Sequence, residues 1–591
     1  MPMIELPDSN RNIAVATGAN LLHALIKSGI YPDAPCGGNG KCGKCKVVVN
    51  GAEVLACQTV VDRNMTVMLP QNSSLRILYE SIGFGQSIAP LQEGYLLSFD
   101  IGTTSVVCFL LDGKTGALLA QSSMQNPQTS FGADVITRIQ AALQGGLEQL
   151  TALIRNGMTE LIQAVCDKAG ILPKQIGVIS VVGNPAMQQL FLGISPENLA
   201  QVPFAPVLTE AQTVSCQEIL PICPLARLLI IPDIGGYVGA DTVGCLLSTK
   251  LYEKDAPTLL VDIGTNGEMV LGNKDRMIAC ATAAGPALEG ANIQFGMRAC
   301  AGAIDHVWLE NGLIRCSVIG GGTAKGICGS GLIDAIAVGL ELGLLNVRGR
   351  IQNTDHIFQL TEDIYLTQDD IRQVQLAKAA ITAGIQLLAR QYGVTLEDID
   401  TVCIAGAFGT FMDPDSACGI GLIPQELRSK IHPIGNAAGA GARLPLQDRS
   451  AWERACQLAR DTEFLELASL PNFNDCYVDA LEFAERIVLN LPYDPNEQQV
   501  QLIAALARFC SPLSPQESVF LLNGYAGTGK TSLTGALVRS LNEVNIPSVL
   551  LAPTGRAAKV FGRFAKHPAY TIHRKIYRQA SSGDATSYVA T

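Results

Sequence analysis

YLLSFDIGTTSVVCFLLDGKTGALLA (residues 95–120) and TLLVDIGTNGEMVLGN (258–273) are two copies of one pattern, and the fold class is predicted from this repeat. In each copy an apolar run ends in Asp-Ile-Gly-Thr and a second apolar run follows, which predicts a strand, a tight turn and another strand. The two aspartates, Asp100 and Asp262, are 162 residues apart, a spacing that indicates two duplicated α/β halves.

The residues of this turn suit a phosphate bound together with a metal ion. A strand that ends in Asp presents a carboxylate that can hold hydrated Mg²⁺. Glycine lets the backbone approach a phosphate, and threonine adds hydroxyl and N–H donors. One such turn is weak evidence because ordinary turns use the same residue types, but two copies on strong strands are much stronger. The turn residues are Gly102, Thr103, Thr104, Gly264 and Thr265.

Further glycine-rich segments lie after each copy. TVCIAGAFGTFMDP (401–414) indicates a strand that runs into small residues against which an adenosine can lie, and GNAAGAGARL (435–444) indicates a turn entering a helix. AAGPALEGANIQFGM (283–297) and GICGSGLIDAI (326–336) can also pass close to a ligand. The alternative for each run is a tight packing turn between a helix and a strand, and for residues 326–336 the two interpretations are equally favoured.

Together these segments resemble the phosphate-1, phosphate-2 and adenosine elements of the acetate kinase, sugar kinase, heat-shock protein and actin superfamily. The resemblance implies an actin-like ATPase with an ATP and Mg²⁺ site. The site residues that it implies are Asp100, Gly102, Thr103, Thr104, Asp262, Gly264, Thr265, Gly406 and Gly409. We nominate Glu289 to position the attacking water, and an ordinary exposed glutamate or helix-cap neighbour is an equally favoured interpretation.

A cysteine-rich loop near the N-terminus indicates a metal centre. CGGNGKCGKCKVVVNGAEVLAC (36–57) has the spacing Cys36-x5-Cys42-x2-Cys45-x11-Cys57. Asn-Gly at 50–51 predicts a two-residue type I′ hairpin turn, which pairs residues whose numbers sum to 101 and brings Cys57 beside Cys45. A zinc site is the alternative, but zinc sites usually pair two Cys-x2-Cys hooks and this loop has one.

This stretch resembles a [2Fe–2S] ferredoxin of β-grasp fold over about residues 1–72. Plant-type ferredoxins have Cys-x4-Cys-x2-Cys and a distant fourth cysteine, so the longer first gap and short last gap depart from that pattern. The resemblance implies a low-potential one-electron carrier whose cluster is held by Cys36, Cys42, Cys45 and Cys57.

A ferredoxin module followed by a linker (73–94) and an actin-like ATPase (95–484) resembles the reductive activators of corrinoid proteins. The segments NPQTSFGADVITRI (126–139), IPDIGGYVGAD (231–241) and LPNFNDCYVDALEF (470–483) look like phrases of that family. One departure is Asn-Pro-Ala-Met at 184–187, where the family pattern has Asn-Thr-Thr-Met.

This resemblance implies ATP-dependent reduction of a partner's corrinoid from Co(II) to Co(I), one electron at a time. The implied partners are a corrinoid protein of a methyltransferase system and a low-potential electron donor, with a homodimer as one possible assembly. Two alternatives remain open. One is a regulatory protein in which the redox state of the cluster gates ATP binding. The other is an activator of a radical dehydratase, a family that usually lacks an N-terminal ferredoxin.

Residues 485–591 carry a different kind of motif. Gly524-x4-Gly529-Lys530-Thr531 lies between a predicted strand and a predicted helix, the context that a Walker A loop requires. In such a loop backbone N–H groups cradle phosphates, Lys530 reaches the outer ones and Thr531 holds Mg²⁺. The unit resembles the front of a RecD-like superfamily 1 helicase motor, so DNA is a partner only here. We expect a truncated, inactive fragment.

Composition and charge exclude several classes of protein. The chain is 48% hydrophobic and 16% charged, which argues against disorder, and its net charge of −11 argues against a basic nucleic-acid coat. Residues 485–591 hold 11 Lys/Arg and 6 Asp/Glu, so the sign of the charge changes there. We expect a cytoplasmic protein without a signal peptide or membrane span, whose 18 cysteines are largely reduced thiols.

Overall fold

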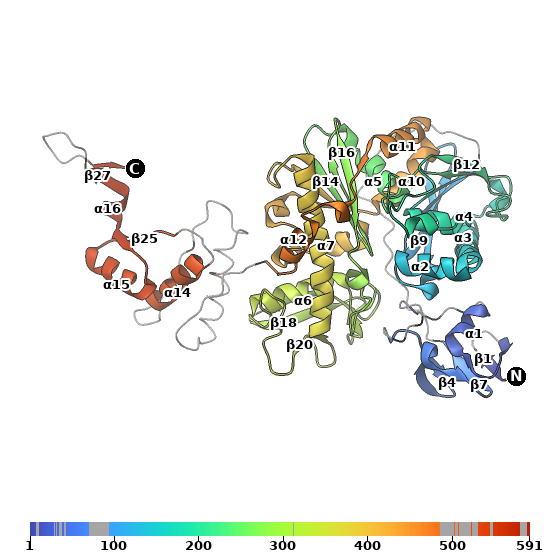
Figure 1. The fold of residues 1–591 in the computed structure, drawn as a ribbon, viewed down its shortest axis with the longest axis horizontal. Coiled ribbons are helices and arrows are strands. Elements are labelled where there is room, and N and C mark those ends of the chain that lie inside the picture. Colours follow the sequence, from blue (N-terminus) through green and yellow to red (C-terminus); the bar gives the residue numbers. More distant parts are fainter. Residues whose placement is uncertain are drawn as a thin grey trace.

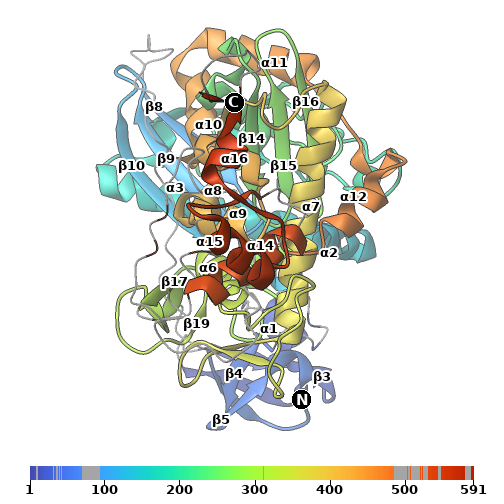
Figure 2. The same cartoon turned by 90° about the vertical axis from the view of Figure 1, so that its left-hand side faces the viewer.

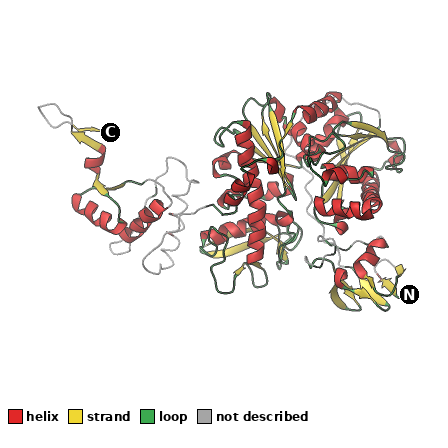
Figure 3. Cartoon of the chain, in the orientation of Figure 1, coloured by secondary structure: helices red, strands yellow, loops and turns green. Residues whose placement is uncertain are grey.

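The computed structural model places three modules along the 591-residue chain (Figure 1). The first module is small and carries the N-terminus. The second consists of two lobes, each with its own sheet, and the third carries the C-terminus. Figure 3 shows helices packed beside the sheets of both lobes. The structure describes residues 1–7, 11–28, 43–69, 94–310, 312–484, 530–543, 548–579 and 588–590, with residues 30, 32, 34, 38, 40, 502, 506, 520 and 522.

The N-terminal module is a mixed sheet with one short helix packed against it. Strands follow the order β2-β1-β7-β4-β5, with β1 and β7 parallel and the other neighbours antiparallel. Asn20 caps the helix by accepting a hydrogen bond from the His23 N–H. The elements are β1 (Met3–Leu6), β2 (Arg11–Ala14), β3 (Ala19–Asn20), α1 (Leu21–Lys27), β4 (Lys46–Val49), β5 (Ala52–Leu55), β6 (Val60–Val61) and β7 (Met65–Met68).

The hairpin between β4 and β5 has the register predicted from its turn. Lys46 faces Leu55 and Val49 faces Ala52, so the paired numbers sum to 101. Asn50 and Gly51 both have positive φ angles, 49° and 87°, as a type I′ turn requires. This confirms the predicted hairpin, and it is the local reason that Cys45 and Cys57 lie side by side.

The first lobe, residues 94–254, is built on a sheet with the order β10-β9-β8-β11-β13-β12. Strands β8, β9 and β10 form an antiparallel meander, and β11 then lies parallel to β8. The elements are β8 (Tyr95–Ile101), β9 (Ser105–Asp112), β10 (Leu118–Gln125), α2 (Val135–Ala141), α3 (Leu147–Ala169), β11 (Ile176–Gly183), α4 (Pro185–Leu192), β12 (Gln212–Ser215), β13 (Arg227–Ile230) and α5 (Ala240–Thr249).

The second lobe repeats this topology. Its main sheet has the order β23-β22-β14-β15-β16-β24, in which β14, β15 and β16 form the meander and β22 lies parallel to β14. The main-sheet strands are β14 (Thr258–Ile263), β15 (Gly267–Gly272), β16 (Met277–Thr282), β22 (Thr401–Ala405), β23 (Ile431–Gly435) and β24 (Glu463–Phe464). The match confirms the duplication that the two Asp-Ile-Gly-Thr copies predict.

A long insertion between β16 and β22 adds a subdomain to the second lobe. It contains the small sheet β18-β17-β19, the hairpin β20-β21 and two long helices. These elements are β17 (Ala303–Glu310), β18 (Leu313–Val318), β19 (Gly326–Ile327), α6 (Gly329–Glu341), β20 (Ile357–Gln359), β21 (Tyr365–Thr367) and α7 (Gln368–Tyr392). The later helices are α8 (Gly406–Phe411), α9 (Pro414–Gly419), α10 (Ala437–Gln447), α11 (Arg449–Asp461) and α12 (Phe473–Asp479).

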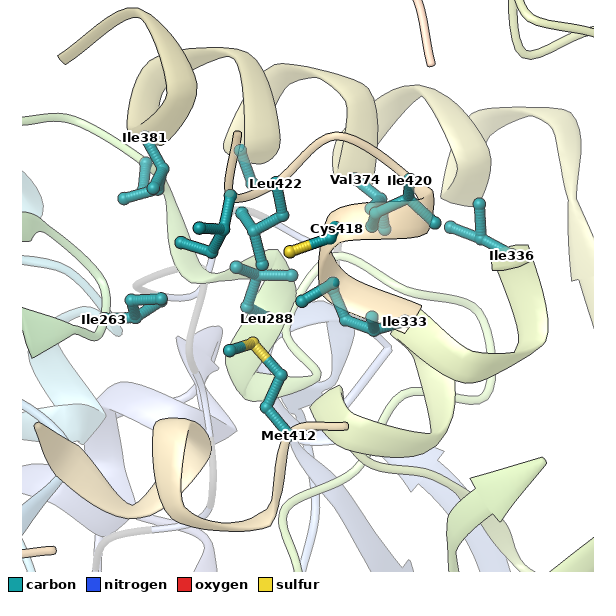
Figure 4. Close-up of a cluster of buried hydrophobic side chains, with 14 of the residues drawn as sticks. Ile263, Leu288, Ile333, Ile336, Val374, Ile381, Met412, Cys418, Ile420 and Leu422 are labelled. Carbon is teal, nitrogen blue, oxygen red and sulfur yellow. The ribbon is translucent and has the colours of Figure 1, made fainter. Parts of the chain in front are cut away.

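A continuous hydrophobic core joins the insertion to the main sheet of the second lobe (Figure 4). Ile333 and Ile336 of α6 lie on the same side of this cluster as Val374 of α7, Cys418 of α9 lies near its centre, and Ile381 lies further along α7. All five side chains are buried. Burying side chains from three separate elements together fixes the insertion as part of the lobe instead of an independent flap.

The two lobes meet where α5 and α10 cross. Gly244 of α5 and Gly441 of α10 contact each other through their backbones, and any side chain at Gly441 would collide with the Gly244 carbonyl. The Ser248 hydroxyl also donates to the Ala437 carbonyl at 2.9 Å. Glycine is therefore required here for close helix approach, and the crossing lies between the two sheets (Figure 1). Figure 2 shows α10 between β9 of the first lobe and β14 of the second.

The C-terminal unit lies at the opposite end of the long axis from the N-terminal module (Figure 1). Its helix α15 packs against α14 and against a short parallel pair, β25 and β26. The described elements are α14 (Lys530–Glu543), β25 (Leu550–Ala552), α15 (Gly555–Ala565), β26 (Ala569–Thr571), α16 (Ile572–Ile576), β27 (Tyr577–Gln579) and β28 (Tyr588–Ala590).

Candidate functional site

The two Asp-Ile-Gly-Thr turns face one cavity between the lobes. Each turn is closed by a backbone hydrogen bond of 2.9 Å, from Gly102 N–H to the Ser105 carbonyl and from Gly264 N–H to the Asn266 carbonyl. The cavity has a volume of about 280 Å³. It is lined by these residues predicted from the sequence: Asp100, Gly102, Thr103, Thr104, Asp262, Gly264, Thr265, Glu289 and Gly406.

Glu289 joins the two turns. It ends a short 3-10 helix, Pro286–Glu289, and its carboxylate accepts hydrogen bonds from Thr104 of the first lobe at 2.9 Å and Thr265 of the second at 2.5 Å. The side chain therefore lies on the cavity wall at the point where both turns converge, and is not an ordinary surface glutamate.

Four carboxylates gather beside the turns: Glu268 is buried, and Asp100, Asp241 and Asp262 are half-buried. Burial raises the pKa of Asp100 to about 6, opposed by a hydrogen bond with Asn436. Burial, and then the charges of Asp100 and Glu289, raise the pKa of Asp262 to about 7. Burial and the charge of Asp262 also raise the pKa of Asp241 to about 7, and the pKa of Glu268 lies well above its ordinary value for the same kind of reason. Such mutual repulsion is relieved when a cation binds.

Asp241 and Glu268 are site residues that sequence reasoning missed. Glu268 is opposite Asp262 in the β14–β15 register, and Asp241 lies in the first turn of α5. A signal existed for Glu268, because a charged residue inside the apolar run of β15 is unusual. Asp241 ends IPDIGGYVGAD (231–241), whose signal in the sequence is its resemblance to the family of corrinoid activators.

Two asparagines orient the first turn and its aspartate. Asn184 caps α4 by accepting from Met187 N–H and donates to the Thr103 hydroxyl at 3.1 Å. Asn436 caps α10 by accepting from Gly439 N–H, and its side chain hydrogen-bonds Asp100. The departure at Asn-Pro-Ala-Met places Pro185 at the first helical position, where proline suits helix geometry.

The side of the cavity that the sequence predicts to hold adenosine is formed by α8 and the start of α6. Gly406 has a φ of 85°, and a Cβ there would lie 2.9 Å from an Asp262 carboxylate oxygen, so glycine is required. Phe408 and the α6 start at Cys328–Ser330 also line the cavity. Gly409 does not line it, because it faces Ile404 and packs α8 onto β22. The glycines after Cys328 serve packing as well, since Gly331 lies against the Ile304 carbonyl.

Arg138 supports the first turn from behind. This side chain is 0% exposed and donates to the Thr103 carbonyl at 2.6 Å and the Gly132 carbonyl at 2.9 Å. Burial lowers the pKa of Arg138 to about 9, and the charge of Asp134 opposes that shift.

We expect Arg138→Met to destabilise the first lobe by about 2–4 kcal/mol, because the buried Gly132 carbonyl and the part-buried Thr103 carbonyl lose charged donors. Thermal unfolding followed by circular dichroism measures the change. Arg227→Met on the exposed face of β13 is the matched control and should unfold like the wild type. Equal unfolding of Arg138→Met and the control would contradict this account.

The cysteine loop is described in part. The Cys57 N–H donates to the Cys45 sulfur at 3.5 Å, and Ala56 N–H donates to the Cys45 carbonyl at 2.8 Å. Cys45 is buried and Cys57 is half-buried. Cys36 and Cys42 lie outside the described residues, as do Gly524 and Gly529 of the Walker A motif. Lys530 and Thr531 are described and begin α14.

Among the described residues, no three Asp, Glu, His or Cys side chains converge closely enough to hold a metal ion, and no helix there is long and apolar enough to cross a membrane.

Two duplicated sheets whose phosphate turns face one cavity define an actin-like ATPase fold of the ASKHA class. The N-terminal module matches a 2Fe-2S iron-sulfur cluster binding domain over residues 4–65.

Comparisons with known protein families identify each module of the chain in turn. Residues 95–254 match the RACo middle region, residues 256–491 match the C-terminal ASKHA domain of RACo, and residues 495–589 match an AAA domain. The chain is 39% identical to the corrinoid activation enzyme RamQ of Eubacterium limosum, over 67% of this chain and 71% of that protein. The chain therefore belongs to the family of reductive activators of corrinoid proteins.

Two further relatives are similar over most of this chain. The [Co(II) methylated amine-specific corrinoid protein] reductase of Methanosarcina barkeri is 27% identical, over 69% of this chain and 80% of that protein. The solved structure of a reductive activator for corrinoid, iron-sulfur protein superposes with a TM-score of 0.61 at 29% identity, covering 82% of this chain and 98% of that one. The AAA match agrees with the P-loop predicted at the C-terminus.

Proposed function

We propose that this chain drives the ATP-dependent one-electron reduction of a partner's corrinoid from Co(II) to Co(I). The observation that carries the proposal is the joining, in one chain, of a 2Fe-2S domain to a two-lobed cavity with paired phosphate turns. The relative RamQ is a corrinoid activation enzyme and the Methanosarcina relative is a reductase of a Co(II) corrinoid protein. The partner proposed here is accordingly a corrinoid protein of a methyltransferase system.

The four cysteines of the N-terminal loop would hold a [2Fe–2S] cluster. The described pair fits this group, because the hairpin sets Cys57 beside Cys45 and directs a backbone N–H at a sulfur, an interaction that tunes such clusters. When bound, the cluster supplies a one-electron carrier near −400 mV if it behaves like plant-type clusters. A low-potential donor of the reducing cytoplasm would refill it.

The cavity would hold Mg²⁺ and ATP. Asp100 and Asp262 lie at the ends of equivalent strands, where carboxylates can bind the water shell of Mg²⁺. The hydroxyls and N–H groups of Thr103, Thr104 and Thr265 would contact phosphate, and Gly406 leaves room for the nucleoside. Glu289, within reach of both turns, would orient the water that attacks the γ-phosphate.

ATP is needed because this electron transfer is uphill. Each 59 mV of unfavourable potential costs a factor of about ten for one electron. In the proposed step the reduced cluster loses one electron, Co(II) gains it, and ATP and water give ADP and phosphate. Nucleotide state can offset the potential gap if it changes the geometry of the complex or the ligands of cobalt.

Anaerobic visible spectroscopy with a corrinoid protein tests this function. With the cluster reduced, we expect the Co(I) band to grow when Mg·ATP is added and to stay absent with Mg·ADP. A chain that binds ATP in a redox-dependent way but never delivers the electron is instead the redox-gated regulatory protein. That outcome would overturn the proposal.

The raised carboxylate pKa values predict a pH-dependent effect of the ligand. A carboxyl whose folded pKa is raised contributes stability at low pH that is lost as pH rises through that pKa, here about 6 for Asp100 and about 7 for Asp262. Bound Mg·ATP supplies a cation that neutralises the ionised carboxylates of Asp100 and Asp262. We therefore expect the rise in Tm caused by Mg·ATP to be larger at pH 8 than at pH 6.

Thermal unfolding at both pH values, with Mg·ATP and with ATP plus a chelator, measures this difference. Each unit of pKa shift corresponds to about 1.4 kcal/mol. A ligand-induced rise in Tm that is equal at both pH values would show that these carboxylates do not meet the bound cation.

We propose the domain boundaries 1–72 for the ferredoxin, 73–94 for the linker, 95–484 for the ATPase and 485–591 for the P-loop unit.

The interlobe cavity supplies the nucleotide contacts, so the P-loop unit is not needed for corrinoid reduction. Lys530→Ala is expected to change the rate of Co(I) formation by less than about twofold. A larger loss would assign the P-loop a part in the reaction. DNA binding and a homodimer remain predictions from the sequence.

A further inference from the structure

One segment of the second lobe runs from the nucleotide cavity to the ferredoxin domain. We call residues 285–299 the connecting segment. Glu289 at its start hydrogen-bonds both phosphate turns. Further along, the Gly296 carbonyl accepts a hydrogen bond from the ammonium of Lys44, which belongs to the cysteine loop and directly precedes Cys45. Met297, Arg298 and Ala299 return to the cavity wall.

The connecting segment is held firmly along its length. Gln294 N–H donates to the buried carboxylate of Asp370 at 2.7 Å, and the Phe295 ring meets the Tyr365 ring edge-on with centroids 4.8 Å apart. Met297 N–H donates to the Ile327 carbonyl at 2.9 Å, directly before the α6 start that lines the cavity. A stiff connector of this kind transmits a displacement at one end to the other.

A nucleotide phosphate would compete with Glu289. The carboxylate accepts from the hydroxyls of Thr104 and Thr265, and these are the donors that a phosphate in the cavity would use. Two anions cannot share those donors without strong repulsion. The short 3-10 helix that carries Glu289 is bounded by Gly285 and Gly290, whose φ angles of 78° and 79° favour glycine. A displacement of Glu289 would therefore move both ends of the connecting segment.

A basic side chain on the same segment favours phosphate. Among the described residues that line the cavity, Arg298 is the one with a basic side chain, and most of the charged residues around it are acidic. A guanidinium binds phosphate oxygens well, and Arg298 lies two residues from Gly296. Phosphate would thus repel Glu289 and attract Arg298, two forces on one segment.

We propose that nucleotide binding and docking of the ferredoxin domain oppose each other through the connecting segment. Phosphate in the cavity moves the segment, weakens the contact between Lys44 and Gly296, and frees the cysteine loop to meet a partner. The inference rests on the proposed function in taking Mg·ATP as the ligand. Because linkage is reciprocal, the Lys44 contact must also weaken nucleotide binding.

The test compares ATP affinity in two matched variants of the full chain. Lys44→Gln removes the docking charge. Lys46→Gln removes a neighbouring charge that instead pairs with Glu53 at 2.8 Å on the exposed face of the ferredoxin domain. With a fluorescent Mg·ATP analogue, we expect Lys44→Gln to bind about three- to tenfold more tightly than the wild type and Lys46→Gln to bind like the wild type.

A double-mutant cycle with Glu289→Gln locates the path. If Glu289 is the cavity end of the coupling, Lys44→Gln should have no further effect on affinity in the Glu289→Gln background. Equal affinities of Lys44→Gln and Lys46→Gln, or additive effects in the cycle, would overturn the coupling while ATP-dependent Co(I) formation stands. A wild-type chain that binds no Mg·ATP would overturn both the coupling and the proposed function.

Discussion

Cys57→Ser is expected to abolish cluster binding and corrinoid reduction while leaving nucleotide binding intact. The β4–β5 hairpin holds Cys57 beside Cys45, with the Cys57 N–H 3.5 Å from the Cys45 sulfur, so a replacement for Cys57 must ligate from the same place. A serine hydroxyl is a far weaker ligand for iron than a thiolate. Iron content and visible cluster absorption should fall to background, and no Co(I) should form with ATP.

Cys456→Ser serves as the matched control, because Cys456 is a half-buried thiol of α11 in the ATPase module. That variant should keep its iron and its activity. The Cys57→Ser chain should still bind the fluorescent Mg·ATP analogue with the wild-type affinity, which shows that the ATPase module has folded. Retention of the cluster by Cys57→Ser would mean that the iron is held elsewhere.

Asp262→Asn is expected to lower ATP hydrolysis by about 10²–10³-fold, with an equal loss of Co(I) formation. Asp262 lies at the end of β14, faces the cavity and carries a raised pKa because burial, Asp100 and Glu289 all disfavour its charge. The amide keeps the shape but cannot neutralise Mg²⁺. Single-turnover hydrolysis under anaerobic conditions measures the loss.

The stability of the same variant separates a functional loss from misfolding. Removing one of several repelling carboxylates should leave the ligand-free protein as stable as the wild type or more so at pH 8, since the raised pKa marks Asp262 as a destabilising charge there. Asp275→Asn, at an exposed turn between β15 and β16, is the control and should hydrolyse ATP normally. Wild-type turnover by Asp262→Asn would remove Asp262 from the proposed site.

The sequence predicted best where the determining interactions are local. Asn50-Gly51 selects a type I′ turn whose register follows from two residues, and the structure confirms the pairing. The two Asp-Ile-Gly-Thr copies predicted duplicated lobes, which the sheet topology confirms. GNAAGAGARL (435–444) predicted a turn entering a helix, and α10 (Ala437–Gln447) begins within that run.

Prediction from the sequence was weaker for residues whose role depends on which part of the structure their side chain or Cα faces. Gly409 follows Gly406 by three residues in the same glycine-rich run, but the turn of α8 directs Gly409 toward Ile404 and away from the cavity. Asp241 ends a segment that resembles the family and Glu268 interrupts an apolar run, but neither signal assigned the residue to the site, where both lie in the group of four carboxylates. Their places depend on strand register and on the packing of α5, which short stretches of sequence do not specify.

The amino-acid sequence alone determined the three kinds of module, the cysteine hairpin and the two phosphate turns, because strand periodicity, turn chemistry and caps act over a few residues. Tertiary structure decided that Glu289 joins Thr104 to Thr265, and that Lys44 reaches Gly296 across 252 residues of chain. The Thr104 contact requires the two lobes to pack together, and the Lys44 contact requires the N-terminal module to pack against the second lobe. Their geometry therefore comes from long-range packing, which no local pattern encodes.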